Sequence, residues 1–178
     1  IDNVERSRKT RMPCTMIKVT LNEKTGETSV WNDGDIVPIE IDEDENCYNH
    51  SMIFGQLLTG SNYDDEEERI ISGRNGLGIK LTNVFSSHFC VRGCDPKNKK
   101  VITQEWHNNM RETDGPKVKS TTLNKGFTEV SWTPDFQYFG IKKYTKDIIR
   151  LYIRYILDAA MLSKVDVYLN NEIIPVRS

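Results

Sequence analysis

The sequence lacks a long apolar run, an excess of positive charge and a leader segment. No stretch of 18 apolar residues occurs among its 178 residues, so we expect no transmembrane helix and no membrane partner. The formal net charge is −2, which argues against a domain whose main role is to bind DNA, since such domains are usually basic. No signal peptide opens the chain, so we expect that the protein is not secreted. With 37% hydrophobic and 28% charged residues, the composition is typical of one globular domain with a proper core.

Cysteine and histidine are both scarce and form no recognisable site. The four cysteines show no paired spacing typical of a zinc site, and we expect free thiols in a reducing compartment: Cys14, Cys47, Cys90 and Cys94. The three histidines share no spacing that suggests a catalytic triad or a metal site, and we predict that they are structural or surface residues: His50, His88 and His107.

Glycine, in contrast, is concentrated in one place. Residues 73–80 read Gly-Arg-Asn-Gly-Leu-Gly-Ile-Lys, and an amphipathic pattern follows. Glycine lets a backbone approach a ligand closely, and the start of a helix offers unpaired N–H groups with a partial positive charge. This combination predicts an anion site, usually for phosphate, to which Arg74 and Lys80 can add charge. The alternative is a flexible surface loop capped by a helix, because short glycine motifs also occur by chance.

This stretch fits neither of two common phosphate-binding motifs. Lys80 is followed by Leu81 instead of Ser or Thr, which excludes a P-loop. The G-x-x-G-x-G order reverses the spacing of a Rossmann fingerprint. The predicted anion site therefore belongs to another fold.

Hydrophobic periodicity predicts an α+β protein. Apolar residues recur at helical spacing after the glycine-rich turn and in two other segments: 51–58 and 148–162. Strands are predicted at 16–21, 28–31, 88–92, 100–106, 117–122, 127–132, 165–169 and 173–176, and the segment 36–41 is expected to be extended. The order favours a two-layer sandwich with a mostly antiparallel sheet and helices on one face. The polar, acidic segment 59–72 has the length of a lid.

Four stretches carry a resemblance to a known family. Residues 2–3 are similar to the end of an E-x-x-x-N-A-x-D-N helix, and residues 31–38 resemble an N-x-G-x-G-I-P stretch. Residues 52–65 are similar to I-F-G-x-L-L-T-S-S-N-Y-D-D, and residues 73–80 resemble G-R-N-G-Y-G-A-K. Together with residues 106–110 and 127–135, these motifs make nearly the whole chain resemble the nucleotide-binding (GHKL, or Bergerat-fold) domain of eukaryotic-type DNA topoisomerase II.

The resemblance implies that the chain binds ATP with Mg²⁺. Asn32 would hydrogen-bond the adenine amine, because an amide offers both a donor and an acceptor. The adenine pocket would be lined by Val37, Ile53, Phe54 and Thr128. The ribose and first phosphate would contact Thr59, Gly60, Ser61 and Asn62. The phosphates would be wrapped by Gly73, Arg74, Asn75, Gly76, Leu77, Gly78, Ile79 and Lys80, with Asn3 and Arg6 at the rim.

The chain also departs from the family pattern. Ile36 replaces the second glycine of N-x-G-x-G, so its side chain is expected to narrow or reshape the base pocket. Gly60 replaces a serine, while Leu77 and Ile79 replace Tyr and Ala at positions whose phosphate contacts are mostly backbone. These differences fit a divergent, viral homologue.

The family's general-base Glu and its Mg²⁺-holding Asn would lie upstream of Asp2. The resemblance therefore implies one GHKL domain over residues 1–178 that lacks the N-terminal strap, the start of the catalytic helix and the C-terminal transducer, and that is inactive alone. The parent enzyme would be a homodimer that couples ATP hydrolysis to gate closure and the passage of duplex DNA, which other domains bind. It would act in the nucleus if cellular, or in a host cell or virion if viral. The alternatives are another GHKL ATPase, of the chaperone or mismatch-repair type, and a non-catalytic nucleotide-binding module.

Overall fold

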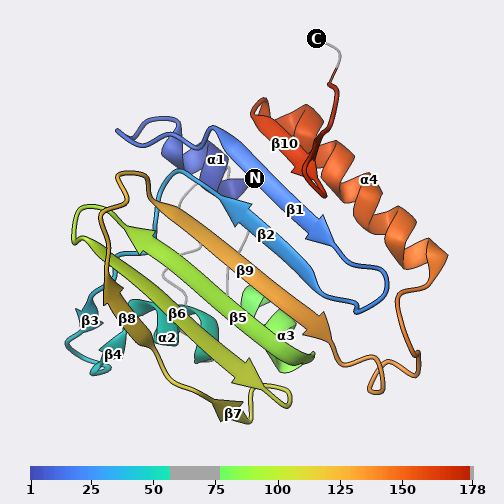
Figure 1. The fold of residues 1–178 in the computed structure, drawn as a ribbon, viewed down its shortest axis with the longest axis horizontal. Helices are drawn as coiled ribbons and strands as arrows, with labels where there is room; N and C mark the ends of the chain where they lie inside the picture. The colour runs from blue at the N-terminus through green and yellow to red at the C-terminus, as the bar shows by residue number, and fades with distance from the viewer. Residues whose placement is uncertain (57–76, 177–178) are drawn as a thin grey trace, which may run out of the picture.

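The computed structural model describes residues 1–56 and 77–176. Within these ranges, nine strands form one sheet in the order β11-β10-β1-β2-β9-β5-β6-β7, with β8 also paired to β6 (Figure 1). The strands of this sheet are β1 (Met16–Leu21), β2 (Thr28–Asn32), β5 (Ser86–Asp95), β6 (Lys100–His107), β7 (Glu112–Thr113), β8 (Lys117–Ser120), β9 (Phe127–Pro134), β10 (Asp166–Leu169) and β11 (Glu172–Ile173). A separate two-stranded sheet pairs β3 (Ile41–Asp42) with β4 (Cys47–Tyr48).

The large sheet is antiparallel except where β10 lies beside β1. These two strands run parallel, with Ile17 opposite Val167. A parallel pair requires a crossover connection, and the chain reaches β10 from β9 through the helix α4 (Lys146–Ser163) (Figure 1). The Thr145 side chain accepts a hydrogen bond from Ile148 N at 3.3 Å and so caps the start of this helix.

The helices cover one face of the sheet. α1 (Asp2–Ser7), α2 (Asn49–Gly55) and α3 (Gly78–Val84) lie behind the strands in Figure 1. Phe89 and Val91 of β5 are fully buried with Phe54 of α2 in one core cluster. A second cluster joins Val4 of α1, Ile17 of β1 and residues of α4 and β10. The alternate residues of β5 and β6 face the opposite, open side of the sheet.

The sequence predicted the long elements well and the short ones poorly. The predicted strand at 16–21 is β1 without change, and the helix expected at 148–162 is α4 with two more residues at its start and one at its end. Residues 36–40 are not a strand, and only Ile41–Asp42 pairs, with β4. The strand expected at 173–176 is limited to Glu172–Ile173. The predicted lid, 59–72, lies outside the described residues.

No helix in the described part of the chain is both long enough and apolar enough to cross a membrane. All four cysteines have free thiols.

Candidate nucleotide-binding site

A polar cavity of about 470 Å³ lies where the first two helices meet the ends of β2 and β9. It brings together seven of the residues predicted to form the ATP site, from segments far apart in the sequence: Asn3, Arg6, Asn32, Val37, Ile53, Phe54 and Thr128. Four further residues complete its wall: Asp35, Ile36, Pro38 and Asn49. Among the described residues of this lining, Arg6 is the one basic side chain and Asp35 the one carboxylate, so the cavity combines charged and apolar groups.

Asn32 reaches this cavity because it is the last residue of β2. Its backbone is paired with Ile17 on one side and Thr128 on the other. Its Nδ2 donates a hydrogen bond to Asp33 O at 2.8 Å. The amide is therefore held at the end of a paired strand, in position to present its remaining donor and acceptor capacity to the cavity.

Asp33 fixes the turn that follows Asn32. Its side chain is 1% exposed, and its Oδ1 accepts hydrogen bonds from Thr15 N at 2.8 Å and Met16 N at 2.9 Å. Its Oδ2 accepts from Thr15 Oγ1 at 2.5 Å and pairs with Lys125 Nζ at 2.6 Å. Burial alone would raise the pKa of Asp33, but the hydrogen bonds from Lys125 and Thr15 outweigh it and hold the pKa well below its usual value. Sequence reasoning did not assign Asp33 this role, because all of its partners are 17 or more residues away in the chain.

Asn3 contributes a polar group that the described residues leave unsatisfied. Its Nδ2 donates to Asp35 O at 2.9 Å. Its Oδ1 is buried and has no hydrogen-bond partner among the residues that the structure describes. Because buried polar atoms are almost always paired, an acceptor of this kind beside a cavity suits a hydroxyl or a water that accompanies a polar ligand.

The apolar wall of the cavity is continuous with the core. Phe54 is 6% exposed and packs with Phe89, while Val37 and Ile53 pack against the same cluster. A flat apolar base suits an aromatic ring, since it can be desolvated there without loss of hydrogen bonds.

Ile36 does not close the cavity. Its Cγ2 packs over Gly126, where an added Cβ would lie only 2.7 Å from it. The lack of a side chain at Gly126 therefore makes room for the side chain that Ile36 carries at a position where the family motif has glycine. Ile36 lines the cavity described above without filling it.

The structure does not bring the start of α3 into this cavity. Lys80 is 1% exposed, and burial lowers the pKa of its ammonium group. Gly78 lines a different cavity, beside Phe85 and Trp132. Ile79 packs against the Phe54 cluster, and Leu77 is the N-cap residue of α3. The remaining predicted ligand-contacting residues lie outside the described ranges: Thr59, Gly60, Ser61, Asn62, Gly73, Arg74, Asn75 and Gly76.

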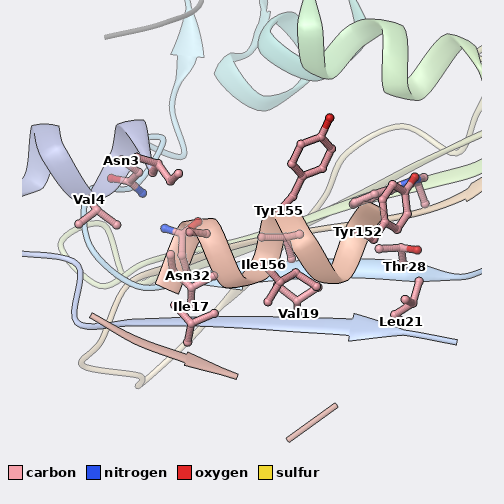
Figure 2. A pocket seen from close by; sticks show the side chains of 15 residues that line it. Asn3, Val4, Ile17, Val19, Leu21, Thr28, Asn32, Tyr152, Tyr155 and Ile156 are labelled. Carbon is pink, nitrogen blue, oxygen red and sulfur yellow. The ribbon is translucent and has the colours of Figure 1, made fainter. Parts of the chain in front are cut away.

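A second cavity, of about 320 Å³, lies between α4 and the sheet and also touches Asn3 and Asn32. Figure 2 shows Ile156 of α4 facing Val19 and Ile17 of β1 across it. None of the described residues that line it has a charged side chain. A phosphorylated ligand would be poorly solvated there, so the polar cavity is the better candidate for a nucleotide.

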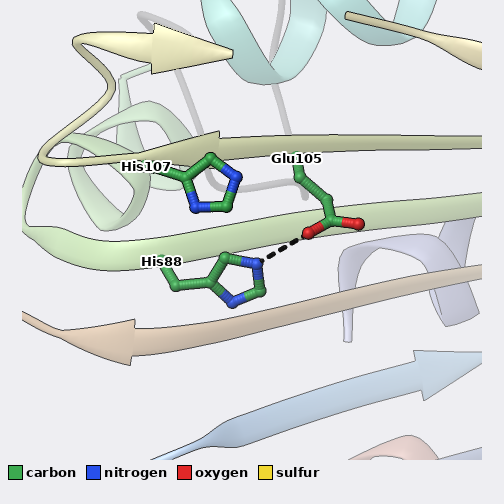
Figure 3. A group of neighbouring side chains, drawn as sticks. All are labelled: His88, Glu105 and His107. Atoms are coloured by element: carbon green, nitrogen blue, oxygen red, sulfur yellow. Dashed lines mark hydrogen bonds and ion pairs between the residues drawn. The ribbon is translucent and has the colours of Figure 1, made fainter. Parts of the chain in front are cut away.

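The structure brings together two histidines that the sequence analysis did not connect. Sequence spacing suggested no metal site, yet the structure brings His88 and His107 together with Glu105 (Figure 3). The sequence did contain a signal. Residues 88 and 107 lie almost equally far from the turn predicted at 95–98, so a hairpin around that turn places them opposite each other. This cluster lies on the open face of the sheet and is separate from the polar cavity.

Comparisons with known proteins agree with the fold. No protein-family model matches the sequence. The chain is 42% identical to DNA topoisomerase 2 of invertebrate iridescent virus 6, over 99% of this chain and 16% of the relative. It matches the crystal structure of the ATPase region of Saccharomyces cerevisiae topoisomerase II with a TM-score of 0.91 and 36% identity, over 99% of this chain and 46% of that one. The 43K ATPase domain of Thermus thermophilus gyrase B, at 19% identity and a TM-score of 0.69, shares the fold.

The mostly antiparallel sheet with helices on one face is the fold of a GHKL-type ATPase domain. The chain is a homologue of DNA topoisomerase II and corresponds to the ATPase region of that family. It spans about a sixth of the length of the viral relative.

Proposed function

We propose that this chain binds ATP in the polar cavity and serves as the ATP-binding core of a type II DNA topoisomerase. The observation that carries the proposal is the convergence of seven residues on one cavity, each assigned to ATP from the sequence alone. If the nucleotide bound elsewhere, nothing would require these seven residues to line a single cavity.

The lining suggests how the nucleotide is oriented. Asn32 would read the adenine amine, while Phe54 and Ile53 form the apolar surface against which the base lies. Arg6, the basic residue at the rim, would face the negatively charged end of the ligand. Binding would then depend on an amide for base identity and on charge for the phosphates.

The described residues alone do not form a Mg²⁺ site at this cavity. Mg²⁺ prefers several oxygen ligands in near-octahedral geometry. Among the residues that the structure describes, the one group of three potential metal ligands is the histidine cluster on the other face. We therefore assign no residue of this chain to Mg²⁺ and derive no step through it.

The proposal is tested by calorimetric titration of the purified chain with a non-hydrolysable ATP analogue. Asn32→Ala should abolish measurable binding or weaken it by about tenfold or more, because a buried hydrogen bond to the base is lost. Asn124→Ala, at an exposed loop position, is the matched control and should bind as the wild type does. If the wild type does not bind, or if both variants bind equally well, the polar cavity is not the ATP site.

At the level of the whole protein, we propose ATP-driven passage of one DNA duplex through another by a homodimer. The proposal rests on the similarity to relatives named DNA topoisomerase 2 from viruses and eukaryotes, and it implies action in a nucleus or in an infected cell. The test is ATP-dependent relaxation of supercoiled DNA by the full-length protein. Absence of relaxation together with ATP turnover would favour a chaperone-type or repair-type GHKL ATPase. For the 178 residues alone we expect nucleotide binding without turnover, which a phosphate-release assay checks.

A further inference from the structure

The open face of the sheet carries a cluster of metal-ligating side chains that the nucleotide site does not use. It consists of His88 on β5 with Glu105 and His107 on β6. One potential ligand atom from each residue lies within 4.8 Å of the others. Figure 3 shows the three side chains on the same side of the two strands, with the carboxylate of Glu105 turned toward the His88 ring.

Strand register brings the two imidazoles together. His88 and His107 are directly opposite each other in the antiparallel pair. The backbone bond from Asn108 N to Ser87 O, 3.0 Å long, lies just outside this pair, which makes it a non-hydrogen-bonded pair. Side chains are closest in pairs of this kind. The ring centroids are 5.1 Å apart, with the planes tilted by 31°.

Glu105 completes the set because it lies two residues before His107 on the same face of β6. Its Oε2 is 3.0 Å from His88 Nε2. Zinc binds His nitrogen at about 2.0–2.1 Å and carboxylate oxygen at about 2.0–2.2 Å, so neighbouring ligand atoms in a tetrahedral site are roughly 3.3–3.5 Å apart. The His88–Glu105 distance is already close to that value, and small side-chain rotations would bring His107 into range.

The surroundings also suit a cation. Asp114 Oδ1 lies 3.7 Å from His107 Nε2, so a second carboxylate borders the cluster. The three side chains are each about one-third exposed, which leaves room for a water molecule as a further ligand. Lys117 approaches the cluster from β8, but it is paired with Asp114 at 3.1 Å.

We propose that His88, Glu105 and His107 form a binding site for a divalent transition-metal ion of the Zn²⁺ class, which links β5 to β6 on the open face of the sheet. Two imidazoles and one carboxylate are typical zinc ligands, and a hard ion such as Mg²⁺ would be poorly matched to them. The site lies on the face opposite the polar cavity, so metal binding there is independent of the nucleotide.

The test is a calorimetric titration of the tag-free protein with Zn²⁺ in the absence of nucleotide. Co²⁺ is then bound in place of Zn²⁺ as a spectroscopic probe of the ligands. We expect one equivalent bound per chain and a Tm that rises with Zn²⁺ concentration. His88→Ala and His107→Ala should each weaken binding by about tenfold or more, and Glu105→Gln should weaken it less than either. The Co²⁺ spectrum should lack a thiolate charge-transfer band, because no cysteine is a ligand.

Glu129→Gln is the matched control, since Glu129 lies on the same face on β9 but pairs with Arg92, at 2.9 Å, instead of with the cluster. It should bind Zn²⁺ as tightly as the wild type. Circular dichroism of each variant checks that it is folded. The proposal is overturned if the wild type binds no stoichiometric Zn²⁺. It is also overturned if folded histidine variants bind as tightly as the wild type, or if the Co²⁺ spectrum shows thiolate ligation.

Discussion

His50 should make the stability of this domain depend on pH between about 7 and 4. The side chain is fully buried at the start of α2, and neither ring nitrogen has a hydrogen-bond partner among the described residues. The ring lies against Gly93, where an added Cβ would be 2.5 Å from Nε2, so the contact leaves no space for water on that side. Burial lowers the pKa of His50 to about 4, and the charge of Asp95 opposes this effect only in part.

The sign of the effect follows from where the proton binds. Between pH 6.5 and about 4, the unfolded chain takes up a proton on His50 that the folded chain excludes. The free energy of unfolding is therefore highest above pH 6.5, falls as the pH is lowered and loses nothing more from this residue below about pH 4. Each pH unit between the two pKa values is worth about 1.4 kcal/mol, so the full effect is about 3 kcal/mol, of which roughly 2 kcal/mol is lost by pH 5.

Urea unfolding at pH 7.5 and pH 5.0, followed by tryptophan fluorescence, measures this loss. His50→Phe keeps an aromatic ring at the site but cannot bind a proton, so its stability should change by about 2 kcal/mol less than that of the wild type. His50→Gln is the alternative if the Phe variant does not fold. Asn124→Ala, at an exposed loop position, is the control and should keep the wild-type loss. If wild type and His50→Phe lose the same stability between the two pH values, the burial argument is wrong.

Three further predictions concern the neighbourhood of the polar cavity. Asp33→Asn should lower the free energy of unfolding by about 2–3 kcal/mol, because it leaves Lys125 without its buried partner. It should also remove the part that Asp33 contributes to the loss of stability as the pH falls below about 4. Urea titrations at pH 7 and pH 3 measure both effects, and an unchanged stability at pH 7 would contradict the role given to Asp33. Gly126→Ala should lower the free energy of unfolding by about 1–3 kcal/mol, because its Cβ would meet Ile36 Cγ2 at 2.7 Å. In a double-mutant cycle, adding Ile36→Ala should recover part of this loss, whereas strictly additive losses would show that the two residues do not contact. Arg6→Gln should weaken binding of the ATP analogue and reduce its dependence on salt, while Arg150→Gln, an exposed residue of α4, should change neither in the same titration.

The sequence allowed the long elements to be predicted because their patterns are local. Residues 16–21 alternate apolar and polar side chains, and the structure pairs that strand on both sides. The segment 36–41 is mostly apolar and was expected to be extended, but it does not form a strand along its length. Pro38 cannot donate a ladder hydrogen bond, and Ile39 N donates at 3.2 Å to Asp95 Oδ2, a side chain rather than a strand. The apolar side chain of Ile39 is instead buried without strand pairing, at 0% exposure.

The candidate site was predictable as a set of residues but not as a geometry. Motif similarity named Asn3, Asn32 and Thr128 together, and the structure places all three on one cavity. The role of Asp33 depends on Lys125, a contact across most of the chain that no local pattern encodes. The pairing of Ile36 with Gly126 is equally non-local. The departure from the family motif was visible in the sequence, whereas its compensation was visible only in three dimensions.

Because of the buried Asp33 carboxylate, a ligand bound in the polar cavity would also affect the backbone at the start of β1. It follows Asn32 directly in the chain, and it fixes the amides of Thr15 and Met16 at the start of β1. Any ligand that restrains the Asn32 amide must also slow the local opening that exposes those two amides, which lie outside the polar cavity. The rates of hydrogen exchange at the Thr15 and Met16 amides would then depend on whether nucleotide is bound in the cavity. In Asp33→Asn, these rates should no longer depend on bound nucleotide.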